Sequence, residues 1–120
     1  MLPRLGPSSR AAGRVALELD AGWPATTSVT RFELLDGARS ARQVRVITEL
    51  LLAMPCLPLD ATAADKAAEV RRTLERGGEA IGMRDALIAG VVLAARALLL
   101  TRKCRHFERV PGLSLGALCS

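Results

Sequence analysis

The sequence predicts a single α/β domain in which helices cover a mostly parallel sheet. Amphipathic helical segments alternate with short extended segments, an order typical of parallel strands joined by helices. Half of the 120 residues are hydrophobic, which favours one buried core over disorder or two separate domains. The most apolar stretch runs from Gly82 to Thr101 and contains one acidic residue, Asp85.

This apolar stretch reads as a buried helix followed by a strand over residues 97–101. It is too short and too charged to span a membrane, because a spanning helix needs about 20 apolar residues and Arg84 and Arg96 interrupt the run. Its helical face consists of Leu87, Ile88, Val91, Val92 and Ala95. Asp85 opens the helix, where a carboxylate suits the positive end of the dipole. A structural and a functional role for Asp85 both stay open.

The N-terminal third predicts a helix and then an extended segment. Ser9 is a suitable N-cap for a helix that runs to about Leu19, with its apolar residues on one face and Gly22 as its end. Pro24 and the threonines that follow favour an extended conformation over Trp23–Thr26.

A short helix is expected next, from Val29 to the Asp36-Gly37 pair, with Thr27 or Ser28 as its cap. It places Glu33 between two apolar residues. Ser40 then caps a helix to about Met54, whose expected buried stripe is Val44, Ile47, Leu51 and Met54.

The segment Cys56–Leu59 predicts a short strand, and its Pro58 indicates an edge position. Asp60 or Thr62 begins the next helix, which Gly77 ends. We expect that helix to cover the sheet with a stripe formed by Ala63, Ala67, Val70 and Leu74.

Charge and cysteine content restrict the partners and the location. The formal net charge is +5 and comes mostly from arginine, which suits nucleic acid or an acidic partner, although a solvated basic surface is an equally simple reading. Three cysteines without a Cys-x-x-Cys pair argue against a disulfide framework or structural zinc. Pro3 and Pro7 lie where a signal peptide would have its apolar region, so a cytoplasmic location is expected.

Three sequence blocks lie at residues 27–38, 81–89 and 101–113, with Leu-Pro-Leu-Asp at 57–60 between the first two. In this order and spacing they resemble the PIN domain family of metal-dependent ribonucleases, which includes the VapC-type toxins of bacterial toxin–antitoxin pairs. By this resemblance, residues 1–120 form one PIN-like domain, and the match is strongest over residues 25–115.

The resemblance implies a three-layer α/β/α fold and an endoribonuclease that hydrolyses RNA phosphodiesters. Members of the family gather about four acidic or amide residues around Mg²⁺ or Mn²⁺. Glu33 and Asp85 match the second and third of these residues and would be both catalytic and metal-binding. Carboxylate oxygens are the ligands that such cations prefer, and a bound cation can lower the pKa of an attacking water. A cognate antitoxin, an RNA substrate and a possible homodimer are the implied partners, with no membrane.

Two members of the acidic set have no match. The first ends the family's first strand, and aligning the expected helix at 9–19 places that strand upstream of Met1. The sheet is therefore expected to lack its first central strand, which leaves the inner edges of the strands at 23–26 and 97–101 unpaired. The fourth member is replaced by Lys103, and a further acid by Arg105.

Other residues are candidates for lining the site. By resemblance Thr101 would point its hydroxyl into it, although a threonine at a strand end can simply be a cap. Asp36, one turn after Glu33, is either a substitute ligand or a solvated turn residue. We expect a structural role for His106. The arginines near the acids could bind RNA phosphates or an acidic antitoxin segment, or be solvated charges; they are Arg31, Arg39, Arg84, Arg102 and Arg105.

Three hypotheses follow from the sequence. The first is a Mg²⁺-dependent endoribonuclease of a toxin–antitoxin system, which requires the Glu33 and Asp85 carboxylates to converge. The second is a catalytically inactive PIN remnant that only binds an antitoxin or RNA. The third is an unrelated basic α/β protein in which Asp85 is merely a residue of a helix end.

Overall fold

The architecture of the chain, taken from a computed structural model, is described for residues 15–19, 23–101 and 104–116. Its sheet has the strand order β3-β2-β1-β4-β5. The strands are β1 (Val15–Leu19), β2 (Trp23–Thr27), β3 (Cys56–Leu57), β4 (Leu98–Thr101) and β5 (Ser114–Leu115). β3 runs parallel to β2 and β5 runs parallel to β4, whereas β1 is antiparallel to both β2 and β4. All strands except β1 therefore share one direction, which confirms the mostly parallel sheet, and β3 lies at an edge as expected.

The prediction of a helix that continues to Leu19 is wrong, because Val15–Leu19 forms a strand. Ser9 and Gly22, the expected cap and end of that helix, lie outside the described residues. The expected gap in the sheet is also wrong, since β1 pairs with both inner edges: Leu17 lies opposite Ala25 of β2 and opposite Leu99 of β4. Each buried backbone group left unpaired would cost about 1 to 3 kcal/mol, so pairing on two sides outweighs the helical pattern.

The described helices are α2 (Ser28–Asp36), α3 (Ala41–Leu52), α4 (Ala61–Arg76), α5 (Met83–Ala95) and α6 (Cys104–Phe107). Side chains at the expected places cap three of them. Thr27 Oγ1 accepts a hydrogen bond from Thr30 N at 3.0 Å, and Ser40 Oγ accepts one from Gln43 N at 3.1 Å. Asp60, not Thr62, caps α4 through a bond of 2.9 Å from Ala63 N. None of the helices in the described ranges is long and apolar enough to cross a membrane.

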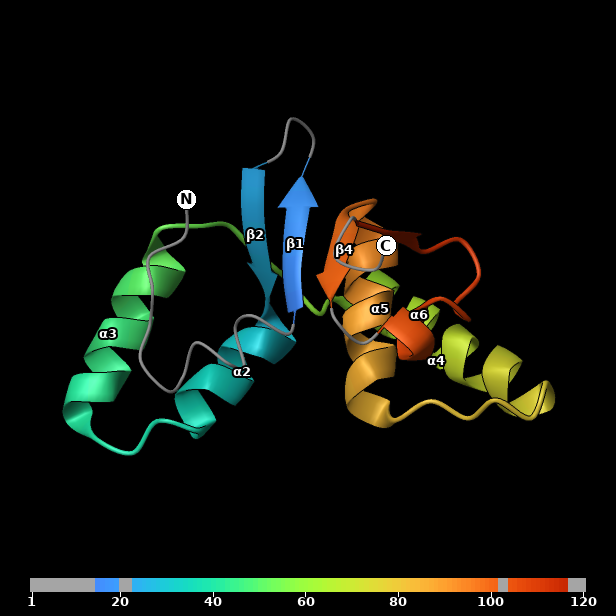
Figure 1. Cartoon of the computed structure of the whole chain (residues 1–120), viewed down its shortest axis with the longest axis horizontal. Helices are drawn as coiled ribbons and strands as arrows, with labels where there is room; N and C mark the ends of the chain where they lie inside the picture. The colour runs from blue at the N-terminus through green and yellow to red at the C-terminus, as the bar shows by residue number, and fades with distance from the viewer. Residues whose placement is uncertain (1–14, 20–22, 102–103, 117–120) are drawn as a thin grey trace.

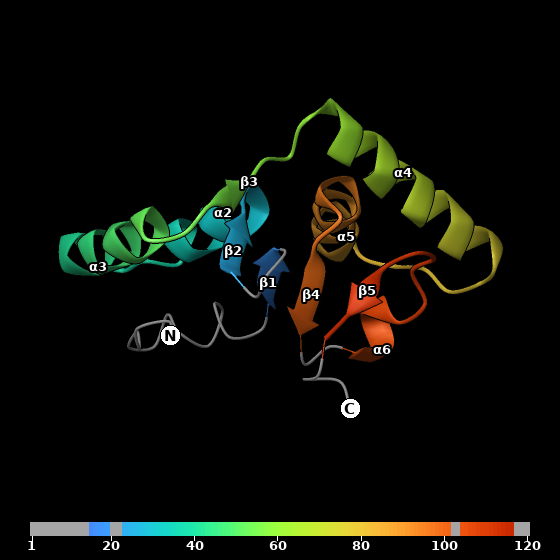
Figure 2. The ribbon, with the colours of Figure 1, turned by 90° about the horizontal axis from the view of Figure 1, so that it is seen from above.

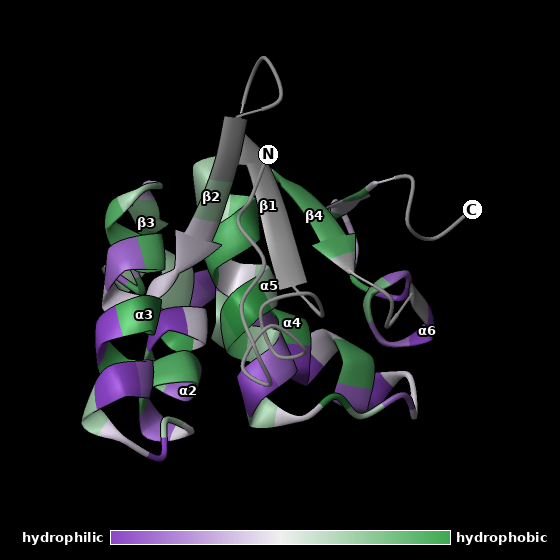
Figure 3. Cartoon of the chain, turned by 60° about the vertical axis from the view of Figure 1, so that its left-hand side comes forward, coloured by the Kyte–Doolittle hydropathy of each residue, from purple (hydrophilic) through white to green (hydrophobic). Residues whose placement is uncertain are grey.

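Helix α5 lies between the sheet and α4 (Figures 1 and 2). Its residues Ile88, Val91 and Val92 are fully buried as expected, whereas Ala95 is exposed. The stripe predicted for α4, from Ala63 to Leu74, is also buried. It packs mainly on α5 and not on the sheet, which corrects the prediction that α4 covers the sheet directly. Figure 3 shows α5 and β4 as largely hydrophobic, in keeping with this central position.

Helices α2 and α3 form a hairpin beside β2 (Figure 1). Their contact is a small cluster of Leu34, Ile47 and Leu51. Val44, expected in the buried stripe of α3, is exposed, and Leu50 is buried instead. Among the described elements, α3 packs mainly against α2, so its buried face is narrower than a stripe extending to Val44 requires.

Helices α4 and α5 approach each other closely at Gly90. An alanine there would place its Cβ 2.7 Å from the Ala67 Cβ and 2.8 Å from the Ala67 nitrogen. Glycine to alanine normally stabilises a helix by about 1 kcal/mol, but Gly90→Ala is expected to lower the free energy of unfolding by about 1 to 3 kcal/mol through overpacking. Urea denaturation measures the change.

The matched control is Gly77→Ala, because a Cβ at that position would make only ordinary contacts of 3.7 Å and 3.8 Å to carbonyl oxygens and the φ of −85° suits alanine. This variant should stay within about 0.5 kcal/mol of the parent. Equal stability of the two variants would contradict the close packing of α4 on α5.

Candidate acidic site

Two carboxylates that are far apart in the sequence meet beside one arginine. Glu33 lies on α2 and Asp85 in the first turn of α5, and Arg84 contacts both. The Arg84 Nε donates a hydrogen bond to Glu33 Oε2, and Nη1 donates one to Asp85 Oδ1 at 2.7 Å. The two acids are therefore brought together, as the ribonuclease hypothesis requires.

Thr27 fixes the position of Glu33. Its side chain is fully buried, caps the first turn of α2, and also donates a hydrogen bond to Thr30 Oγ1 at 3.1 Å. The helix that carries Glu33 thus starts at a defined point, directly where β2 ends. Asp85 is held by the burial of α5, which has no side-chain cap, and its own side chain is only 10% exposed.

The electrostatics of the site are dominated by Arg84. Burial by itself lowers the pKa of its guanidinium. The hydrogen bond and charge of Glu33, followed by the charge and hydrogen bond of Asp85, raise the pKa by more, so that it stands above its ordinary value. Arg84 is consequently a permanent cation at this place.

His106 of α6 also reaches Asp85. Its Nδ1 lies 3.2 Å from Asp85 Oδ2, and 56% of its side chain is exposed. The next residue, Phe107, is fully buried in the core and anchors α6. Phe107 provides the packing of this short helix, whereas His106 places an exposed imidazole beside the acid, so the structural role expected of His106 itself stays a prediction.

The remaining candidates are not all in the described region. Lys103 and Arg102 lie outside it, and of Thr101 only the backbone is described, at the end of β4. Asp36 is the exposed last residue of α2, and Arg39 and Arg105 are exposed as well. Within the described ranges, no group of three or more His, Cys, Asp or Glu residues could hold a metal ion.

This arrangement does not fit a divalent cation between Glu33 and Asp85. The carboxylates are the right kind of ligand, but the guanidinium of Arg84 contacts both of them. A unit charge about 4 Å from a divalent cation would cost roughly 8 kcal/mol at an effective dielectric of 20, twice the value for two unit charges. Arg84 and a metal ion would therefore exclude each other here.

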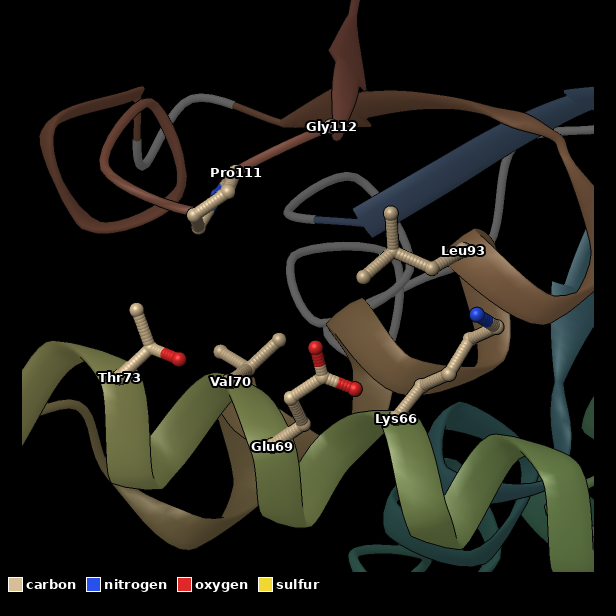
Figure 4. A pocket seen from close by; sticks show the side chains of 7 residues that line it. All are labelled: Lys66, Glu69, Val70, Thr73, Leu93, Pro111 and Gly112. Atoms are coloured by element: carbon tan, nitrogen blue, oxygen red, sulfur yellow. The ribbon is translucent and has the colours of Figure 1, made fainter.

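A separate cavity of about 270 Å³ lies between α4 and the segment at Pro111 and Gly112 (Figure 4). Lys66 and Glu69 supply charged groups to its wall, and Val70 and Leu93 supply apolar ones. Neither Glu33 nor Asp85 lines it, so it is distinct from the acidic site.

The fold and the converging acids agree with comparisons to known proteins. A profile of the PIN domain matches residues 8–113. The chain is 34% identical over 107 residues to a tRNA(fMet)-specific endonuclease VapC of Shigella flexneri, covering 86% of this chain and 81% of that protein. The chain belongs to the PIN domain family and resembles its VapC branch.

Solved structures give the same result. The structure of DNA-bound VapBC from Salmonella typhimurium has a TM-score of 0.73 and 30% identity, over 79% of this chain and 75% of that one. VapBC-5 of Mycobacterium tuberculosis, a member of the VapBC family of toxin–antitoxin systems, has a TM-score of 0.57 and 27% identity over 77% and 78% of the chains. The α/β PIN fold expected from the sequence is thus confirmed.

The sequence did not indicate that Arg84 and His106 contact the acids. Arg84 was one of several arginines near the acids, and nothing in a single sequence distinguishes an arginine that bridges two helices from a solvated one. The one available signal is that Arg84 directly precedes Asp85 in the first turn of α5.

The Thr27 cap is open to a direct test. Thr27→Val removes the acceptor for Thr30 N and is expected to lower the free energy of unfolding by about 1 to 2 kcal/mol, as measured by urea denaturation. Ser28→Ala is the control, since that hydroxyl makes only long contacts, at 3.4 Å to Leu57 O and at 3.9 Å to Cys56 Sγ. Should Ser28→Ala cost as much as Thr27→Val, the cap would not be what positions α2.

Proposed function

We propose that this chain is an endoribonuclease toxin of a toxin–antitoxin pair and that Glu33 and Asp85 are its catalytic acids. The observation that carries the proposal is the convergence of these carboxylates from α2 and α5 on one guanidinium. Support comes from a relative named as a tRNA-specific endonuclease. A structured RNA such as a tRNA is accordingly the proposed substrate.

The chain's own charges suit that substrate. The net charge of +5 favours a polyanion. Exposed arginines such as Arg105 can bind phosphates close to the acids, because Arg105 precedes His106, which touches Asp85. Mg²⁺ or Mn²⁺ is the cofactor proposed from the family resemblance, and Glu33 and Asp85 are the residues that would hold it; the contact of Arg84 with both carboxylates stands against this part of the proposal.

A cytoplasmic location and a cognate antitoxin complete the proposal. The structural neighbours named as VapBC complexes support such a partner. An antitoxin segment rich in acids would complement the arginines, and association of two copies of the chain is proposed from the same resemblance.

The second candidate function is a non-catalytic module that binds an antitoxin or RNA. One observation favours it: Arg84 lies where a metal ion would have to bridge the acids. Lys103, at the position of the family's fourth acid, points in the same direction. The two functions differ in a single property, cleavage.

Cleavage of tRNA by the purified chain separates them. Cleavage is expected with Mg²⁺ or Mn²⁺ and is expected to stop with EDTA. Asp85→Asn and Glu33→Gln should each lower the rate by at least about 100-fold, the usual range for an acid or base group. Glu49→Gln, an exposed acid on α3, is the matched control and should leave the rate unchanged.

Binding of tRNA without cleavage under any of these conditions would establish the non-catalytic module. Cleavage that survives both EDTA and Asp85→Asn would instead assign the activity to other residues and overturn the role of the acid pair.

A further inference from the structure

The β2 side and the β4 side of the molecule carry separate apolar clusters. Helices α2 and α3 lie on the β2 side, and α4, α5 and α6 lie on the β4 side (Figures 1 and 2). Within the described ranges, Leu34, Ile47 and Leu51 of the hairpin form a cluster of their own, apart from the main core around α5. At the start of α2, Val29 still packs on the main core. One turn further along α2, Glu33 is joined to α5 by an ion pair instead.

Arg84 supplies that ion pair. Its Nε donates a hydrogen bond to Glu33 Oε2 and its Nη1 donates one to Asp85 Oδ1 at 2.7 Å, so one guanidinium uses different nitrogens for carboxylates on different helices. A planar guanidinium that is always charged suits such a contact. About 31% of the Arg84 side chain, 28% of Glu33 and 10% of Asp85 are exposed, so salt screens these pairs less than pairs on the open surface.

The oxygens that a metal ion would need are engaged by the chain itself. Asp85 Oδ1 and Glu33 Oε2 accept hydrogen bonds from Arg84, and Asp85 Oδ2 lies 3.2 Å from His106 Nδ1. Mg²⁺ demands a nearly octahedral set of oxygen ligands. No group of three or more His, Cys, Asp or Glu residues in the described part of the chain could hold a metal ion. The residues present therefore fit a resident guanidinium and not a divalent cation.

We propose that Arg84 is the resident cation of the Glu33–Asp85 pair and that it clamps the α2–α3 hairpin onto α5 in place of a metal ion. The pair then holds two parts of the fold together with a charge that belongs to the chain. The inference goes beyond the proposed function and replaces only its cofactor at this pair. It agrees with the second candidate function, for which the pair needs no metal ion.

Hydrogen exchange together with thermal unfolding tests the clamp. Arg84→Met keeps a long unbranched side chain but removes the charge and the donors. We expect the Tm to fall by about 4 °C and the amides of α3 to exchange at least about tenfold faster, with a smaller change in α4, because the hairpin opens locally once its tie to α5 is lost. Arg45→Met, which removes an exposed arginine on α3, is the matched control and should leave both quantities unchanged.

The effect should act through Glu33. Glu33→Gln by itself should also speed exchange in α3, whereas in the Arg84→Met background the same substitution should change the exchange by less than about twofold, because residues in one ion pair are not independent. Additive effects of the two substitutions, or unchanged exchange in Arg84→Met, would overturn the clamp.

The only histidine of the chain reports on a metal ion at the pair without any variant at Arg84. Because His106 Nδ1 lies 3.2 Å from Asp85 Oδ2, a paramagnetic Mn²⁺ held by the pair would broaden the NMR signals of the His106 ring. We expect millimolar Mn²⁺ to affect these signals equally in the unmodified chain and in Glu33→Gln. Broadening that Glu33→Gln abolishes would locate the metal ion at the pair and overturn the proposal.

Failure of the proposed function looks different. If the chain does not cleave tRNA although exchange and NMR signals behave as expected, the clamp stands and the endoribonuclease does not. Cleavage that stops with EDTA, together with Mn²⁺ broadening that requires Glu33, would overturn the clamp and leave the proposed function in place.

Discussion

The burial of α5 between the sheet and α4 is the constraint on which the rest of the structure depends. Gly90 lets α4 approach closely, and the apolar residues of α5 fill the space between α4 and β4. A helix held on several sides has a fixed first turn, so the residues at its start are placed with little freedom. The packing of α5 therefore holds the buried Asp85 at a defined position.

The acidic site follows from that placement together with the cap on α2. Two carboxylates held on separate packed helices repel each other unless a cation lies between them, and burial strengthens the repulsion because the surroundings are less polar than water. Arg84 supplies this cation. A divalent metal ion would offset the same repulsion. The catalytic and the non-catalytic function therefore differ in which cation the two carboxylates hold, a metal ion or the guanidinium of Arg84.

His106 adds a feature that the acids alone do not provide. Its imidazole is exposed yet lies beside the buried Asp85, while Phe107 ties the same short helix to the core. The imidazole of His106 and the guanidinium of Arg84 therefore both lie against Asp85. The cavity beside Pro111 lies apart from this edge and is lined by different residues.

Most helices were determined by the sequence itself. Local signals were sufficient for α2, α3 and α4, because a capping side chain and an apolar repeat act within a few residues. The pairing of Glu33 with Asp85 was also anticipated, through the resemblance to a family. The strand at Val15–Leu19 was not, because its five residues suit either a helix or a strand.

Only the tertiary structure decided between those two states for β1. The deciding interaction is backbone pairing with β2 on one side and β4 on the other, and β4 lies more than 70 residues further along the chain. The contact of Arg84 with both Glu33 and Asp85 also depends on the tertiary structure. A sequence specifies which charges are near each other along the chain, whereas the ion pair depends on how α2 and α5 pack in space.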